Sequence, residues 1–300
     1  MTEWLYRLTS RLSRSVGSWL LRTVVAIVAT GYFVLLPRRL GHSVRLYRAL
    51  YPDRSWLFAL ALAFRQYQDF AAVYWERQEI DRRSDVHFES EGTHHVTEAK
   101  SAGRGAILLM SHVGRWEIGA RLLAKQESDL VLLMGGEAPD GARAGVDQDL
   151  RGAGLGVVTV RRGRESDFNV LRISQILRKG GVVSLAADRA IGQARMLELP
   201  FLGHTVRIGA APFALALSSG APLLVVFAVK TGPWRYRFSC DPPVVLTAQC
   251  PADRPRVMQQ AAMDYLGRLH DIIKAHPEQW QHFGEFLRRN PQDPNRPVPT

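Results

Sequence analysis

The sequence predicts an α/β fold: a single domain with a largely parallel central sheet flanked by helices, preceded by an N-terminal hydrophobic helical segment. From residue 105 onward, short apolar runs of strand length alternate with stretches of helical period, an order typical of parallel α/β sheets. The chain has 300 residues, 46% of them hydrophobic, which is enough for one sizeable core. No second stretch reads as a domain of comparable size.

The first predicted element is an uncharged apolar run over residues 23–36, which lengthens to 18 residues when residues 19–21 and the charged Arg22 are included. A membrane span needs about 20 apolar residues. The run therefore suits a short transmembrane helix, an interfacial helix, an arm of a hydrophobic hairpin or a buried core helix. Arginines flank it on both sides, so the positive-inside rule gives no orientation, and no small-residue cleavage site follows it. We expect residues 1–55 to form a retained membrane-anchoring segment.

The main domain is predicted over residues 56–289, and the proline-rich stretch 290–300 is predicted to be a disordered tail. The domain opens with an aromatic-rich helix over residues 56–75. A hairpin-like pair (235–239 and 243–247) and a helix over 255–275 close it. Between them we expect strands at 105–111, 130–134, 156–160, 181–187 and 222–229, and helices at 115–125, 141–152, 166–179 and 207–219.

Charge and cysteine content narrow the classes of partner. The formal net charge is +11, carried mostly by arginine because the chain has only five lysines. This balance suits an anionic membrane surface or the phosphates of a coenzyme or carrier protein, although arginines spread over solvated faces give the same total. No nucleic-acid-binding motif is recognisable, so we expect no nucleic-acid partner. Cys240 and Cys250 lack metal-ligand spacing and cannot form a disulfide framework, so we expect no metal site.

The most informative pair of residues is His112 and Glu117. His112 ends the apolar run 106–110, and a helix is predicted to begin near Arg115. A histidine at such a strand end can take a proton from a hydroxyl near neutral pH. A carboxylate in the first turn of the helix can reach back, fix the tautomer and stabilise the imidazolium. The pair forms a base and its orienter without a protein nucleophile, which indicates activation of an external alcohol or amine.

Five segments, taken in order, resemble the lysophospholipid acyltransferase superfamily, in particular its bacterial branch of lipid A (lauroyl/myristoyl-type) acyltransferases. Together they span roughly residues 100–290. They are Ser-His-Val-Gly-Arg-Trp-Glu (111–117), Ala-Ala-Asp-Arg (186–189), Pro-Phe-Leu-Gly (200–203) with Ile-Gly-Ala-Ala-Pro-Phe-Ala-Leu-Ala (208–216), Ser-Gly-Ala-Pro-Leu-Leu (219–224) and His-Pro-Glu-Gln-Trp (276–280).

The resemblance implies the roles of general base for His112 and its acidic partner for Glu117. It also implies transfer of a fatty acyl group from a thioester donor, acyl-CoA or acyl carrier protein, to a hydroxyl of a lipid or glycolipid. No metal or redox cofactor is implied. The implied location is a bacterial inner membrane, with the catalytic domain facing the cytoplasm. In such an enzyme the aromatic-rich helix over 56–75 is either part of the core or the cover of an acyl tunnel. The oligomeric state stays open.

Further candidate residues lie at the predicted carboxyl edge of the sheet, where open α/β sheets bind ligands. Arg161 and Arg162 follow one strand, as a clamp for a donor phosphate or acidic headgroup, or as solvated loop charge. Asp188 and Arg189 end another strand, and they either bound the site or form a structural salt bridge. The expected substrate-binding residues are Arg115, Arg161, Arg162, Asp188, Arg189 and Gly203.

Two rival functions belong to other classes. One is a thioesterase-like hydrolase, in which water replaces the acceptor and free fatty acid is released. The other is a non-catalytic lipid-binding protein with the same fold. The sequence contains no Gly-x-Ser-x-Gly element, which argues against a serine hydrolase with Ser111 as its nucleophile.

Overall fold

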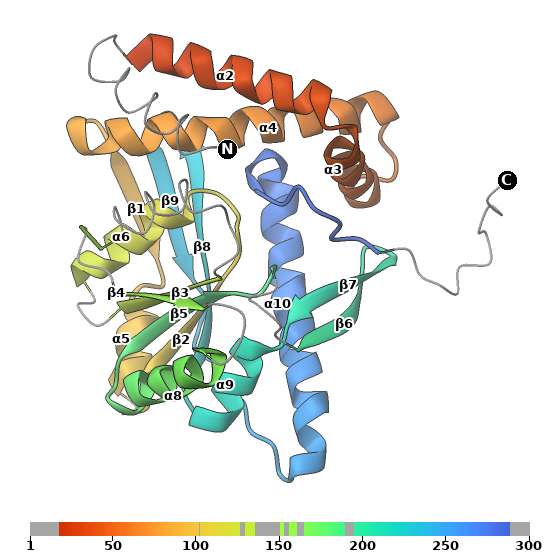
Figure 1. The fold of residues 1–300 in the computed structure, drawn as a ribbon. Helices are drawn as coiled ribbons and strands as arrows, with labels where there is room; N and C mark the ends of the chain where they lie inside the picture. Colours follow the sequence, from red (N-terminus) through yellow and green to blue (C-terminus); the bar gives the residue numbers. More distant parts are fainter. Residues whose placement is uncertain are drawn as a thin grey trace, which may run out of the picture.

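A computed structural model of the chain describes residues 18–101, 103–126, 130–135, 151–152, 156–160, 165–189 and 195–288. Within these residues a seven-stranded sheet has the order β1-β9-β8-β2-β5-β3-β4 (Figure 1). Its strands are β1 (His87–Glu91), β2 (Ala106–Met110), β3 (Leu130–Gly135), β4 (Gly156–Val160), β5 (Val182–Ala186), β8 (Leu223–Gly232) and β9 (Arg235–Cys240).

Helices surround this sheet. They are α2 (Ser18–Leu35), α3 (Pro37–Leu50), α4 (Trp56–Glu79), α5 (His94–Ser101), α6 (Trp116–Gln126), α8 (Glu165–Arg178), α9 (Ala211–Ser219) and α10 (Arg254–Ala275). Three short 3₁₀ turns cover Ile80–Arg82, Pro251–Asp253 and Pro277–Gln279. The predicted α/β class with a mostly parallel sheet is confirmed.

The strand directions place the carboxyl ends of the central strands together. Strands β8, β2, β5, β3 and β4 are parallel, while β9 is antiparallel to β8 and β1 is parallel to β9. In the register of β2 and β5, Met110 pairs with Ala186. The residues that follow these two strands therefore start from neighbouring positions at one edge of the sheet, where α/β proteins usually bind their ligands.

The central strand β2 is buried on both faces, as its uninterrupted apolar run predicts. Ile107 and Leu109 belong to a large hydrophobic cluster shared with α8, α9 and α10. Ala106 and Leu108 belong to a second cluster on the other face, shared with α5 and α6. The sheet is thus a middle layer between two helical layers.

The N-terminal helices form a further layer across one end of the sheet (Figure 1). Helix α4 begins at the N-cap Ser55, whose side chain accepts a hydrogen bond from the Phe58 amide, and it runs over the ends of β1, β9 and β8. Helix α2 lies along α4, and Leu21, Val25 and Ala29 are buried in a small cluster with Ala71 of α4. Pro37 begins α3, which makes an angle of 90° with α2.

The structure corrects several element predictions. The helix expected over 207–219 begins only at Ala211, because residues 204–209 form β7, the antiparallel partner of β6 (Met196–Phe201). The strand expected at 243–247 is absent: β9 pairs with β8, and Val244 makes only an isolated bridge with Leu223. Most of the helix expected over 141–152 lies outside the described residues. The domain division at residue 55 stays a prediction.

Candidate active site

His112 lies just beyond the carboxyl end of β2, with Ser111 between them. The chain turns at Gly114, whose φ is +70°, and a Cβ there would lie 2.1 Å from the Ala228 carbonyl oxygen. Only glycine fits this turn without strain. The turn lets the Arg115 amide donate to the same carbonyl, and α6 begins one residue later. The His112 side chain is 21% exposed, so it is held by the protein but open to solvent.

Asp188 is the direct partner of the His112 ring. It follows β5, the neighbour of β2, and its Oδ1 lies 2.8 Å from Nδ1 of His112. Its Oδ2 accepts from the His112 backbone amide at 2.9 Å and from Nε1 of Trp280 at 3.1 Å. The sequence prediction placed Asp188 among the substrate-binding residues. In the structure its fully buried carboxylate contacts the histidine, and substrate binding stays a prediction.

The electrostatics fix how this pair is protonated. Burial opposes ionisation of Asp188, but the charge and hydrogen bond of His112, helped by Arg189 and His282, outweigh it and hold the Asp188 pKa well below its usual range. An ionised carboxylate only accepts hydrogen bonds, so Nδ1 of His112 carries a proton. When the ring is neutral, Nε2 then has a free lone pair and can act as a base.

Glu117 does not take the place that its spacing suggested. It lies in the first turn of α6, and its Oε2 accepts from Nη1 of Arg77 in α4 at 3.0 Å. Both side chains of this ion pair are largely buried. The carboxylate against the His112 ring is therefore Asp188 and not Glu117, because the turn at Gly114 directs the two ends of the His-x4-Glu motif to different neighbours.

Arg115, expected to bind substrate, lies in a buried network of ion pairs. Its side chain is 1% exposed and is held by a bidentate pair with Asp69, at 2.7 and 2.9 Å, and by Glu76 at 2.7 Å. Lys230 also contacts Glu76. Burial opposes the charge of Arg115, but the hydrogen bonds and charges of the two acids raise its pKa above the ordinary value. This buried network fastens α4 to residues 111–115 between β2 and α6, which we call the catalytic loop.

A segment far along the chain completes the site. Residues 279–281 pair with the catalytic loop: the Gln281 amide donates to the His112 carbonyl at 2.8 Å, and the Gly114 amide donates to the Gln279 carbonyl at 2.9 Å. The Gln281 side chain also donates to the Gly114 carbonyl at 2.7 Å. Arg189, expected to bind substrate, donates to the Gln281 carbonyl oxygen. The motif 276–280 marked this segment in the sequence, but nothing local in it identified what Trp280 contacts.

A second histidine, His282, lies near His112 and Asp188. No signal in the sequence marked it as a site residue. Burial lowers its pKa to about 4; Asp188 opposes this shift, whereas Arg189 and His112 add to it. His282 is therefore neutral at pH 7, and its buried Nδ1 has no hydrogen-bond partner in the described part of the chain. Of these two rings, His112 is the one that has both an ionised hydrogen-bond partner and access to solvent.

The remaining candidate residues fall elsewhere. Arg161 and Arg162 lie outside the described residues, so their role as a clamp stays a prediction. Gly203 forms the turn between β6 and β7, with a φ of +73° directly after Leu202 at +52°. Positive φ values at two successive residues suit a tight hairpin turn, which explains the glycine without a substrate contact.

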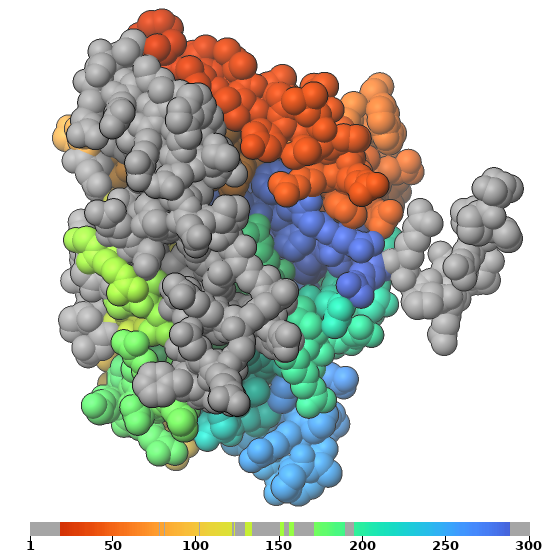
Figure 2. All heavy atoms as spheres, viewed as in Figure 1, coloured from red at the N-terminus to blue at the C-terminus, as the bar shows by residue number. Residues whose placement is uncertain are grey.

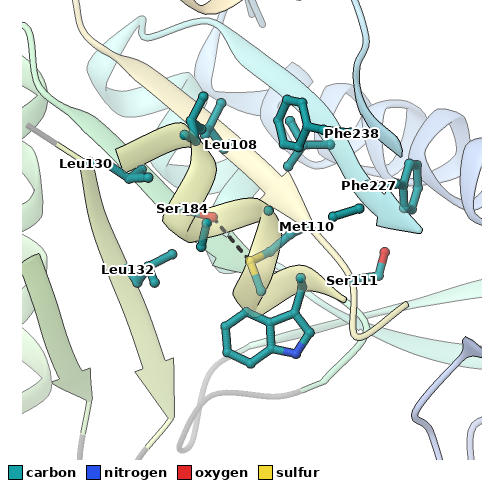
Figure 3. Close-up of a pocket in the computed structure, with 14 residues that line it drawn as sticks. Leu108, Met110, Ser111, Leu130, Leu132, Ser184, Phe227 and Phe238 are labelled. Atoms are coloured by element: carbon teal, nitrogen blue, oxygen red, sulfur yellow. Dashed lines mark hydrogen bonds between the residues drawn. The ribbon is translucent and has the colours of Figure 1, made fainter. Parts of the chain in front are cut away.

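An apolar pocket lies beside the catalytic loop, between α6 and the sheet (Figure 3). Its volume is about 30 Å³. Ser111 and Trp116 line it near the loop, and Leu130 and Leu132 line it on β3. Ser184 and Met110 also line it, and the Ser184 hydroxyl donates a hydrogen bond to the Met110 sulfur at 3.2 Å. The pocket thus offers space for a small apolar group beside Ser111, the residue that precedes His112.

One group of metal-ligand residue types lies together in the part of the chain that the structure describes. His94, His95 and Glu98 of α5 bring one ligand atom each within 4.8 Å of one another. They stand in the first turns of the helix, where the positive end of the helix dipole disfavours a cation. The expectation that the reaction uses no metal stays a prediction.

The site thus combines a partly exposed histidine just beyond a strand end with a buried, ionised carboxylate against its ring. Residues 61–289 match the family model of the bacterial lipid A biosynthesis acyltransferases, and the chain belongs to this family. The resemblance drawn from the sequence motifs is confirmed.

The curated proteins that the chain resembles are also named as acyltransferases. The chain is 27% identical over 190 residues to a phosphatidylinositol mannoside acyltransferase of Mycobacterium tuberculosis (strain ATCC 25618 / H37Rv), covering 63% of the chain and 56% of that protein. It is 26% identical over 132 residues to the protein of the same name from Mycolicibacterium smegmatis (strain ATCC 700084 / mc(2)155), covering 44% of the chain and 42% of that protein. The matched stretch thus spans about half the length of these relatives.

Proposed function

We propose that the protein transfers a fatty acyl group from a thioester donor to a hydroxyl of a membrane glycolipid. The observation that carries this proposal is the solvent-accessible His112, whose ring is oriented by the buried, ionised Asp188. Family membership and the names of the curated relatives support acyl transfer and a glycolipid acceptor. Acyl-CoA and acyl carrier protein are both suitable donors, because each brings negative charge to a protein with a net charge of +11.

In the proposed mechanism Nε2 of His112 takes the proton of the acceptor hydroxyl as its oxygen attacks the thioester carbonyl carbon. Asp188 stabilises the imidazolium through Nδ1. When the tetrahedral intermediate collapses, the carbon–sulfur bond breaks. The imidazolium then returns its proton to the leaving thiolate, so the enzyme ends in its starting state.

The oxyanion of the intermediate needs donors outside the catalytic loop. The amides of His112, Gly114 and Arg115 already donate to Asp188, Gln279 and Ala228. Arg189 directly follows Asp188, just past the end of β5. Arg161 and Arg162 directly follow β4, a strand of the same sheet. We propose that one of these arginines faces the oxyanion.

The apolar pocket between α6 and the sheet supports an acyl substrate, because Ser111, the residue before His112, is one of the residues that line it. At about 30 Å³ it has room for only two or three water-sized groups. We propose that it receives the end of the acyl chain and that longer chains require α6 to move outward.

The function is tested by incubating the purified protein with a radiolabelled acyl thioester, with and without a glycolipid acceptor. We expect labelled glycolipid when a phosphatidylinositol mannoside or a lipid A precursor is present, and little free fatty acid in its absence. Release of free fatty acid at the same rate without acceptor would instead identify a thioesterase-like hydrolase. Lipid binding without turnover of any donor would identify a non-catalytic lipid-binding protein.

We further propose that the helical layer α2–α4 rests on the membrane that holds the acceptor. The outer surface of this layer carries large exposed apolar side chains, and an open groove of about 780 Å³ runs between α2 and α4. Figure 2 shows α2 spread over one end of the molecule. The exposed apolar side chains are Trp19, Ile27, Tyr32, Val34, Leu35, Trp56, Leu57, Phe58 and Phe64.

The charge of this layer suits an anionic surface. Residues 18–65 contain seven arginines and a single acidic residue, Asp53. Arg22, Arg38, Arg39 and Arg54 are exposed. Apolar side chains that enter the lipid, with arginines at headgroup level, are typical of proteins bound to one leaflet.

The packing of α2 supports binding to one leaflet. No single helix among the described residues is long and apolar enough to cross a membrane, and only the bent pair α2–α3 passes that test of length and composition. Leu21, Val25 and Ala29 are buried against α4. If α2 crossed the membrane, it would have to separate from α4, and the apolar surfaces that the two helices bury against each other would be exposed.

Membrane docking is tested with the double variant Trp56→Ser/Leu57→Ser. We expect its binding to vesicles containing phosphatidylglycerol to weaken about tenfold or more, because two exposed apolar side chains no longer enter the lipid. The control is Leu171→Ser, which removes a comparably exposed leucine from α8 and should bind like the wild type. Flotation at low and high salt measures both effects, and equal binding of all three proteins would contradict the docking surface.

A further inference from the structure

Trp280 is the fully buried side chain that donates to the far oxygen of Asp188. Its indole Nε1 lies 3.1 Å from Oδ2, the oxygen that also accepts from the His112 amide. The other oxygen, Oδ1, faces the His112 ring. Asp188 therefore has two donors on one oxygen and the catalytic imidazole on the other.

The protein holds the indole in place on several sides. The Trp280 carbonyl accepts from Nε2 of Gln66 in α4 at 2.6 Å, and its backbone pairs with Val113 inside the catalytic loop. The ring packs edge-on against Phe286, with centroids 4.8 Å apart. With backbone and ring both fixed, the N–H direction is set before any substrate binds.

We propose that Trp280 is a positioning residue for acyl transfer: its indole N–H fixes the rotamer of Asp188 and limits the negative charge that Asp188 presents to His112. This inference rests on the proposed function, because its consequence is the basicity of the catalytic histidine. A hydrogen bond to Oδ2 withdraws electron density from the carboxylate. The indole thus keeps the imidazole from being protonated too readily to act as a base.

The test is Trp280→Phe, which keeps an aromatic ring in the core but removes the donor. Without the N–H, Asp188 stabilises the imidazolium more strongly, so His112 stays protonated to a higher pH. We expect the acidic limb of the kcat/KM profile to move up by roughly half a unit, and kcat at low pH to fall more than KM changes. An unmoved limb, or one that moves down, overturns the proposal.

A matched control separates the hydrogen bond from packing. Phe286→Leu disturbs the contact with the same indole ring but leaves the N–H on Asp188. We expect this variant to lose stability without moving the acidic limb. Equal shifts in both variants would mean that Trp280 acts only through packing, and the proposal would be wrong.

Two further measurements keep the inference testable if Trp280→Phe folds poorly or if no acyl acceptor is found. Benzothienylalanine incorporated at position 280 keeps the ring shape and replaces the N–H with sulfur, and it should give the same upward shift. Nitrogen NMR of histidine-labelled protein reports the titration midpoint of His112 without substrate, with the signal assigned by its loss in His112→Ala. A raised midpoint supports the role of Trp280 even if the transferase reaction is absent, whereas an unchanged midpoint overturns it.

Discussion

Replacing His112 with alanine is expected to abolish acyl transfer while the protein stays folded. Loss of a positioned general base typically lowers the rate by 10²–10⁴-fold. The side chain contributes little to the core because it is partly exposed at the sheet edge, so its removal should not unfold the domain. Steady-state transfer of a labelled acyl group, measured beside circular dichroism of the same sample, checks the prediction.

The matched control for His112→Ala is His282→Asn. His282 lies near the same carboxylate, but it is neutral at pH 7 and largely buried. If the His282 variant were inactive and the His112 variant kept near wild-type transfer, the base would have been assigned to the wrong ring.

The second large effect is expected from Asp188→Asn. An asparagine can offer Nδ1 of His112 an N–H and thereby stabilise the wrong tautomer; the same change in a Ser-His-Asp triad lowers kcat about 10⁴-fold. Because the Asp188 carboxyl stays ionised far below neutral pH, it should add no limb of its own to a pH profile between about 5 and 8. A pH profile of kcat for wild type and variant measures both points.

Glu117→Gln is the comparison for Asp188→Asn. Glu117 contacts Arg77 and not the His112 ring, so the glutamine should reduce transfer less than about tenfold and act mainly on stability. Thermal unfolding and kcat are measured on the same preparations. If Glu117→Gln were as inactive as Asp188→Asn, the family's acidic residue would act on catalysis by a route other than direct contact with His112.

The sequence predicted where His112 lies but not which carboxylate contacts its ring, for a geometric reason. The apolar run 106–110 and Gly114 are local signals, and they place His112 at a strand end correctly. The partner depends on which strand lies beside β2, and 76 positions separate His112 from Asp188 along the chain. Local spacing therefore favours Glu117, the nearest carboxylate in the sequence, although Arg77 of another helix holds it in the structure.

The fold was predictable where the periodicity was strong. The buried strands β2, β5 and β8 follow from apolar runs, whereas β1, His87–Glu91, contains mostly polar, exposed residues and gave no such signal. The hairpin β6–β7 was missed because the apolar stretch after Gly203 was read as one helix. Alternate burial in β6 and the two positive φ values at Leu202 and Gly203 mark the strand-turn-strand instead.

The pairing of residues 279–281 with the catalytic loop sets the order in which the site can be completed during synthesis. A chain that has emerged from the ribosome only as far as Arg189, just past β5, already contains His112 and Asp188. It still lacks Trp280 and Gln281, which hydrogen-bond to them. Domains begin to fold while they are being synthesised. In a partly made chain the His112 loop therefore lacks these contacts until residues 279–281 have been synthesised and have paired with it.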